Sequence, residues 1–182
     1  MKKSLRIIVP AVSVLALASL LGAAGPANIP APGPMPPADN QKVAHDIFRD
    51  LVEIRSVHDI GTKGTADVIV KYLKANGFTD ADIHVAPETK YPNQVNVVVR
   101  IKGKGKGKPV MWICHMDVVD AKKEDWTPGL DPYKFTEKDG YWYGRGTSDM
   151  KDEDAAVAAS LIRLKKEGYV PDRDIVVAFT AD

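Results

Sequence analysis

The chain has 182 residues, with 25 lysine and arginine residues against 24 aspartate and glutamate residues. This near-neutral balance argues against a protein that binds nucleic acid through its net charge. Hydrophobic residues make up 45% and charged residues 27% of the chain, which is typical of a soluble globular domain and excludes a wholly disordered chain or a multi-span membrane protein. The single cysteine, Cys114, excludes an intramolecular disulfide framework and a zinc site built from cysteines.

The first 24 residues have the pattern of a secretory signal peptide. The basic residues Lys2, Lys3 and Arg6 precede an uncharged stretch over 7–24, which ends in the small residues Gly22, Ala23 and Ala24. We therefore expect cleavage near Ala24 and an exported protein, periplasmic or secreted, with no membrane contact afterwards. An uncleaved anchor is the alternative, because an uncharged stretch of this length is at the lower limit for a membrane span.

Residues 25–38 are rich in proline and lack the apolar side chains needed for a core. We expect an extended linker over 25–38 and a folded domain over 39–182.

Helical and strand patterns alternate in the folded part. The apolar spacing predicts helices over 40–55, 65–76 and 149–166, and strands over 83–86, 94–101, 110–114 and 174–180. We expect Asp39 to cap the first helix. The last helix should bury Ala155, Ala156, Ala159, Ile162 and Leu164.

The strand over 110–114 is continuously apolar, which predicts burial on both faces. Strand, helix and strand in succession predict a parallel crossover from this strand to the one over 174–180. The lysine–glycine run over 102–108 is not followed by a helix, so it does not fit a phosphate-binding loop. We expect a solvated hairpin turn there.

Polar residues stand where the predicted strands and the last helix meet. His115 and Asp117 follow the strand over 110–114, and Asp149 precedes the helix. Ligands of open α/β sheets bind beyond the carboxyl ends of the strands. Asp117 could accept a hydrogen bond from the imidazole of His115 and so orient it toward a metal. The residues alone leave two alternatives open: a structural histidine at a strand end, and an aspartate that caps a helix.

Other candidate residues are more easily explained by structural roles. We expect Cys114 to be a small buried hydrophobic residue, and the histidines His45, His58 and His84 to be structural or solvated. Arg145 could bind an oxyanion, but we favour a structural ion pair. The aromatic residues Trp126, Trp142 and Tyr143 fit packing better than substrate binding.

An ordered set of motifs resembles the co-catalytic zinc exopeptidase and deacylase family. The motifs are 115–119, Trp126, Asp131-Pro132-Tyr133 and the run 139–151. Members of the family include glutamate carboxypeptidase, aminoacylase, acetylornithine deacetylase and succinyl-diaminopimelate desuccinylase. The resemblance implies a three-layer α/β/α catalytic domain with a mixed, largely parallel sheet.

The resemblance also implies the chemistry of the site. His115 would bind one zinc ion, Asp149 would bridge two, and Asp117 would orient His115 from behind. A cis peptide bond between Asp149 and Met150 is implied as well. Cobalt or manganese could replace zinc, because mixed nitrogen and oxygen ligands are not exclusive to zinc. The expected substrates are peptides or N-acyl amino acids. The family usually has glycine where this chain has Asp152.

The resemblance further implies that the chain is an N-terminal fragment. The general base is expected directly beyond Asp182, together with the remaining metal ligands and a smaller domain that could form a homodimer. We therefore expect the 182-residue chain alone to be inactive and to bind zinc weakly. The alternative is a non-catalytic α/β binding module that keeps the fold without the chemistry.

Overall fold

The computed structural model describes residues 33–181. The chain divides into two units, Met1–Met35 and Pro36–Asp182, and the second holds all the helices and strands described. The predicted signal peptide over 1–24 and most of the linker over 25–38 lie outside the described residues. Among residues 33–181, no helix has the length and apolar character needed to cross a bilayer.

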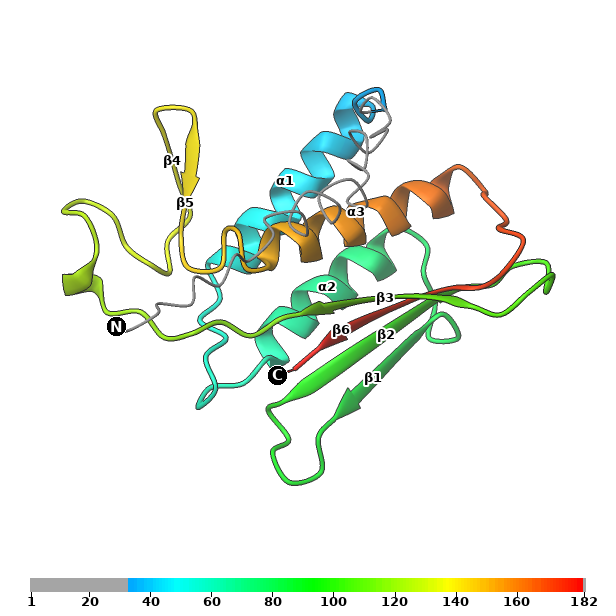
Figure 1. Cartoon of the computed structure of the whole chain (residues 1–182), viewed down its shortest axis with the longest axis horizontal. Helices are drawn as coiled ribbons and strands as arrows, with labels where there is room; N and C mark the ends of the chain where they lie inside the picture. Colours follow the sequence, from blue (N-terminus) through cyan, green and yellow to red (C-terminus); the bar gives the residue numbers. More distant parts are fainter. Residues whose placement is uncertain (1–32, 182) are drawn as a thin grey trace, which may run out of the picture. The chain divides into compact units, whose positions relative to one another are not determined.

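Three helices cover one face of a four-stranded mixed sheet (Figure 1). The helices are α1 (Ala38–Val52), α2 (Lys63–Ala75) and α3 (Lys151–Lys166), and the strands are β1 (Ile83–Pro87), β2 (Val95–Ile101), β3 (Val110–His115) and β6 (Ile175–Thr180). The strand order is β1-β2-β6-β3. The β1–β2 and β2–β6 pairs are antiparallel, and the β3–β6 pair is parallel. The predicted mixed sheet and the parallel crossover through α3 are therefore confirmed. The expectation that the sheet is largely parallel does not hold for the described strands, because two of their three pairs are antiparallel.

The core lies between the helices and the sheet. In β2 the burial alternates: Val97 and Val99 have no exposed surface, whereas Val98 is half-buried and Arg100 is exposed. Such alternation is typical of a strand with only one covered face. Ile47 and Leu51 of α1 and Ile69 and Leu73 of α2 are fully buried on the helical side. The described residues thus form two layers of the predicted three.

The prediction that the strand over 110–114 is buried on both faces is wrong. β3 is an edge strand of the described sheet, and Met111, Trp112 and Ile113 are 58%, 52% and 61% exposed. Cys114 is the exception at 1% exposure, as expected, because it faces the helices. An apolar run indicates a strand whose side chains avoid water, but it does not show which face of the strand the neighbouring elements will cover.

The helix ends differ from the predictions by a few residues. Asp39 does not cap α1, because the helix begins at Ala38 and the carbonyl of Pro37 accepts the amides of Asn40 and Gln41. Proline has a fixed φ that suits the entry to a helix, so it takes the place that Asp39 was expected to fill.

The buried face of α3 also differs from the prediction. Ala156 is exposed and Leu164 half-buried, whereas Asp154, Ala158 and Leu161 are buried.

The lysine–glycine run over 102–108 is exposed but is not a hairpin turn. It joins β2 to β3, which are not neighbours, because β6 lies between them. The run instead packs against the segment before β6: Lys104 and Lys106 donate their amides to the carbonyls of Pro171 and Asp172.

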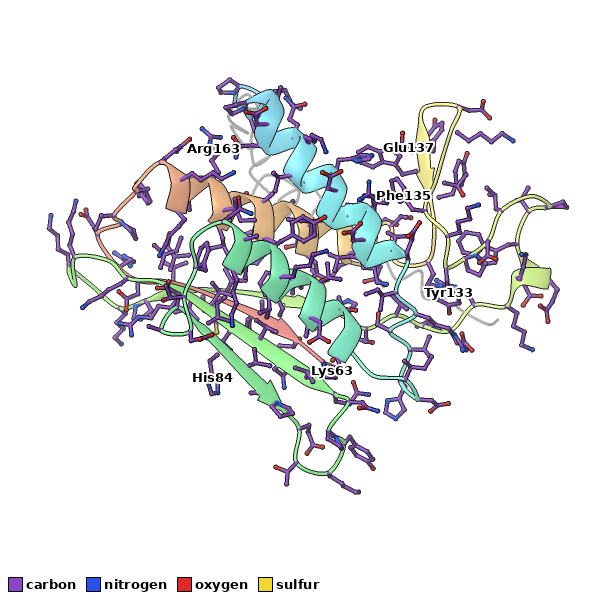
Figure 2. All side chains as sticks on the ribbon, turned by 180° about the vertical axis from the view of Figure 1, so that it is seen from behind. Lys63, His84, Tyr133, Phe135, Glu137 and Arg163 are labelled. Atoms are coloured by element: carbon purple, nitrogen blue, oxygen red, sulfur yellow. The ribbon has the colours of Figure 1, made fainter. Side chains whose placement is uncertain are left out.

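A hairpin that the sequence analysis did not predict precedes α3. It consists of β4 (Thr136–Lys138) and β5 (Tyr141–Tyr143). Asp139 and Gly140 form its turn with φ angles of 53° and 79°. An Asp-Gly pair is a common signal for such a turn, so the hairpin could have been predicted. The hairpin lies beside α1 in Figure 1, and in Figure 2 its Glu137 lies close to that helix.

We expect Gly144→Ala to destabilise the protein, because an added Cβ would lie 2.3 Å from Cγ1 of Val52. Overpacking of this kind costs about 1–3 kcal/mol in free energy of unfolding. Thermal unfolding of the full-length protein would measure the effect. In the variant Val52→Ala/Gly144→Ala the clash is gone, so its destabilisation should be smaller than the sum of the single effects. Additive effects would contradict the contact.

Candidate metal centre

The ends of two parallel strands and the start of α3 bring three polar side chains together. β3 ends at His115, which is opposite Thr180 at the end of β6. Asp149 lies two residues before α3. The imidazole Nε2 of His115 is 3.0 Å from Oδ1 of Asp149, and its Nδ1 is 3.1 Å from Oδ1 of Asp117. The two predicted ligands therefore meet at the carboxyl edge of the sheet, with Asp117 on the other side of the ring.

The charges around His115 favour its protonated form. Burial lowers the pKa of the imidazole, but the hydrogen bond to Asp149 and the negative charge of Asp117 together raise it above its ordinary value. The side chain of Asp149 is 85% exposed, whereas those of His115 and Asp117 are 36% and 23% exposed. The Asp149 carboxylate is thus open to solvent, and Asp117 lies deeper.

Backbone contacts fix the segment that carries His115 and Asp117. The amide of Met116 donates to the carbonyl of Thr180 at 2.8 Å. The hydroxyl of Ser56 donates to the carbonyl of Met116, and the amide of Val118 donates to the carbonyl of Ser56. The segment after β3 is therefore held between β6 and the loop that follows α1.

The turn that carries Asp149 is also attached to β3. Asp149 and Met150 are joined by a cis peptide bond, as the resemblance implies. The sulfur of Met150 accepts a hydrogen bond from the amide of His115 at 3.2 Å. The residue next to one candidate ligand thus contacts the backbone of the other.

A cluster near the site was missed by the sequence analysis. Arg55 binds both carboxylate oxygens of Asp120 at 2.8 Å, and the hydroxyl of Tyr133 donates to Asp120 at 2.7 Å. The hydrogen bonds from Arg55 and Tyr133 lower the pKa of Asp120 to about 2. This cluster joins the loops after α1 and β3 to the Asp-Pro-Tyr turn. No local pattern predicts it, because Arg55 and Asp120 are 65 residues apart.

Two buried charged residues on the first turn of α3 were also missed. Lys151 and Asp154 have no exposed surface. Burial lowers the pKa of Lys151 to about 8 and raises that of Asp154 to about 8. Neither carboxylate oxygen of Asp154 has a hydrogen-bond partner among residues 33–181. Both lie at helical spacing from the buried Ala155, Ala158 and Ile162, whereas Asp152 lies on the exposed face, so the periodicity of α3 could have indicated their burial.

The remaining candidates have structural or solvated positions. His45 contacts Glu137 and packs edge-on against Phe135 and Trp142, which supports packing roles for His45 and Trp142. His58 and His84 are exposed, and Figure 2 shows His84 on β1.

The expected ion pair of Arg145 is not found among residues 33–181. Its Nε is buried without a hydrogen-bond partner there, and its backbone amide donates to the carbonyl of Pro132. The glycines on either side constrain the backbone, because Gly144 lies against Val52 and Gly146 has a φ of 85°.

The donor set of His115 and Asp149 fits a divalent metal such as zinc. Zinc bonds to imidazole nitrogen and carboxylate oxygen are about 2.0–2.2 Å long, so two donors to one ion lie within about 4 Å of each other. The 3.0 Å separation meets this condition. Within residues 33–181, no group of three or more histidine, cysteine or acidic side chains is arranged to hold an ion. The assignment of His115 and Asp149 as ligands stays a prediction.

Comparison with known proteins confirms the family resemblance. Residues 111–182 match the model of peptidase family M20/M25/M40. The chain is similar to a protein of Staphylococcus aureus named probable succinyl-diaminopimelate desuccinylase, with 34% identity over 145 residues. The matched region is 78% of this chain and 33% of that protein. The chain thus spans about a third of the length of the curated relatives it matches.

Solved structures support the same fold. The di-peptidase Dug1p of Saccharomyces cerevisiae has a TM-score of 0.61 at 19% identity, covering 79% of this chain and 32% of that one. The YXEP protein of Bacillus subtilis, described as a dinuclear metal binding peptidase from the M20 family, has a TM-score of 0.52 at 16% identity, covering 79% and 36%. The α/β peptidase fold expected from the motifs is therefore confirmed.

We expect Asp117→Asn to lower the pKa of His115, because the negative charge that favours the imidazolium form is removed. Titration of the imidazole signals by NMR in metal-free, full-length protein would measure the change. Asp120→Asn is the matched control, since Asp120 binds Arg55 and Tyr133 instead of His115. An unchanged His115 titration in Asp117→Asn would contradict the orienting contact.

Proposed function

We propose that the protein containing this chain is a metal-dependent hydrolase of amide bonds, acting as an exopeptidase or as a deacylase of N-acyl amino acids. The observation that carries the proposal is the approach of His115 Nε2 and Asp149 Oδ1 to 3.0 Å at the carboxyl edge of the sheet. The match to the M20/M25/M40 model over the same segment supports it. So does the 34% identity to the staphylococcal relative.

Each of the three site residues has a distinct role in this proposal. Asp149 presents an exposed carboxylate that can bridge two ions, and His115 presents its Nε2 to one of them. Asp117 accepts a hydrogen bond from Nδ1, so loss of a proton on metal binding would leave Nε2 as the donor atom. Zinc is the proposed metal, and cobalt or manganese would suit the same donors. When bound, a metal pair supplies an activated water and polarises the substrate carbonyl.

The choice between an enzyme and a non-catalytic binding module depends on groups outside residues 33–181. Amide hydrolysis needs a general base, which contributes about 10²–10⁴ in rate. The family resemblance implies two consecutive glutamates after the last strand, the first as base and the second as ligand. Sequence of the complete gene without such a pair would favour the binding module.

We expect His115→Ala and Asp149→Ala in the full-length protein to weaken zinc binding and to lower kcat/KM by ~10²-fold or more, since loss of a mere supporting residue already costs 10–100-fold. Zinc content by elemental analysis and hydrolysis of dipeptides and N-acetyl amino acids would measure both effects. His84→Ala is the control, because His84 is exposed on β1. Zinc binding and turnover that are unchanged in His115→Ala would refute the proposed site.

We also propose that the protein is exported and that its mature chain begins after Ala24. The support is the basic start, uncharged middle and small-residue end of residues 1–24. Amino-terminal sequencing of protein from a bacterial host should find a terminus close to Gly25. A cytoplasmic protein that still begins at Met1 would contradict export.

A further inference from the structure

Lys151 is buried in an unusual environment for a lysine. Its side chain has no exposed surface, and its ammonium Nζ donates to the carbonyls of Leu51 and Ile54 at 2.8 and 2.6 Å. These carbonyls lie in the last turn of α1 and just beyond it. The last carbonyls of a helix lack partners within the helix and carry its negative partial charge. The lysine at the start of α3 therefore caps the end of α1.

The same lysine belongs to the turn that carries Asp149. The amides of Asp149 and Lys151 both donate to the carbonyl of Gly146, at 3.4 and 3.0 Å. Gly146 has a φ of 85°, and a Cβ there would lie 3.1 Å from Cδ of Lys151. The turn thus packs against the aliphatic part of the Lys151 side chain, and the ammonium group of Lys151 is hydrogen-bonded to the end of α1.

The position of Asp149 depends on this turn. Its side chain is 85% exposed, and its only side-chain hydrogen bond among residues 33–181 is the one with His115. Apart from that hydrogen bond, little of the carboxylate is covered, so its position depends mainly on the backbone of the turn. Two contacts hold that backbone. The Met150 sulfur accepts a hydrogen bond from the amide of His115, and the ammonium of Lys151 donates to the carbonyl of Leu51 in α1.

Packing alone does not require a cation at this position. An apolar side chain of similar length would fill the same space without the desolvation that a buried ammonium suffers. What the ammonium adds is a directed connection to two carbonyls. Asp154 is not part of that connection, because neither of its oxygens has a partner among the described residues.

We propose that Lys151 is a positioning residue of the metal centre: by capping α1, it fixes the turn over 146–150 and holds the Asp149 carboxylate beside His115. The inference rests on the proposed function, since it assumes that Asp149 binds metal. It assigns Lys151 no contact with substrate or metal.

The test compares three variants of the full-length protein with wild type. Lys151→Met removes the ammonium and keeps the length of the side chain. Lys151→Met/Asp154→Leu also removes the neighbouring buried carboxyl group, so that no unpaired polar group is left in the core beside the methionine. Asp154→Leu alone leaves both hydrogen bonds of Lys151 in place. Ile101→Ala is the control for general destabilisation, because Ile101 is buried opposite Ile175, at the other end of the sheet from His115.

The measurements are Zn²⁺ affinity by competition with a chromophoric chelator, the visible spectrum of the Co²⁺-loaded protein, and thermal unfolding. We expect both Lys151 variants to bind Zn²⁺ about 10–100-fold more weakly, with an altered Co²⁺ spectrum, as is found when groups that orient ligands are removed. Ile101→Ala should keep the wild-type affinity and spectrum. Asp154→Leu is the baseline for the double variant, because the Asp154 carboxyl group acts electrostatically on His115 and Lys151. A purely structural role would change thermal unfolding in the Lys151 variants and leave the spectrum of the folded protein as in wild type.

The outcomes separate this inference from the proposed function. Tight Zn²⁺ binding by wild type together with equal binding by either folded Lys151 variant would overturn the inference alone. A wild type that binds no Zn²⁺ would overturn the proposed function and the inference with it. If Lys151→Met does not fold, Lys151→Gln replaces it, because its amide can keep one of the two hydrogen bonds. Its affinity should lie between those of wild type and the double variant, and wild-type affinity would count against the inference.

Discussion

The parallel pairing of β3 with β6 is the constraint on which the candidate site depends. Parallel strands end at the same edge, and the connection between them must cross over the sheet, here through α3. Since α3 returns the chain to the start of β6, α3 itself begins at the carboxyl edge of the sheet. Asp149, just before α3, therefore lies beside His115 at the end of β3, although the two residues are 34 positions apart. The register places His115 opposite Thr180 at the last pair of the ladder, so its imidazole lies at the edge of the sheet.

The helices supply a second constraint, which acts through α1. Its end contacts the turn before α3 in two ways: Val52 lies against Gly144, and the carbonyl of Leu51 accepts the ammonium of Lys151. The loop that follows α1 supplies Ser56 to the segment after β3 and Arg55 to Asp120. The polar surroundings of His115 and Asp149 thus come from chain segments that are distant in sequence and converge at the carboxyl end of one helix.

The main elements could be predicted from sequence, because apolar periodicity is a local property. The meeting of His115 with Asp149 was expected from the parallel crossover together with the family resemblance. The exposure of Met111 and Ile113 could not be predicted, because an apolar strand has the same sequence pattern whether or not another layer covers it. The burial of Lys151 and Asp154 was overlooked, although both lie on the apolar face of α3 with Ala155, Ala158 and Ile162. Charged residues are almost always exposed, and the sequence does not show that the carbonyls of Leu51 and Ile54 accept the ammonium of Lys151. The Asp139-Gly140 turn was predictable and was overlooked.

The burial of Asp154 couples folding to proton uptake. An exposed aspartate in the unfolded chain is ionised above about pH 4. In the folded protein, burial raises the pKa of Asp154 to about 8, so the carboxyl group keeps its proton up to that pH. Between these two values unfolding releases a proton, and the contribution of Asp154 to stability falls as the pH rises. Paired carboxylates make most proteins less stable in acid, whereas this residue makes mild acidity favourable to the folded state.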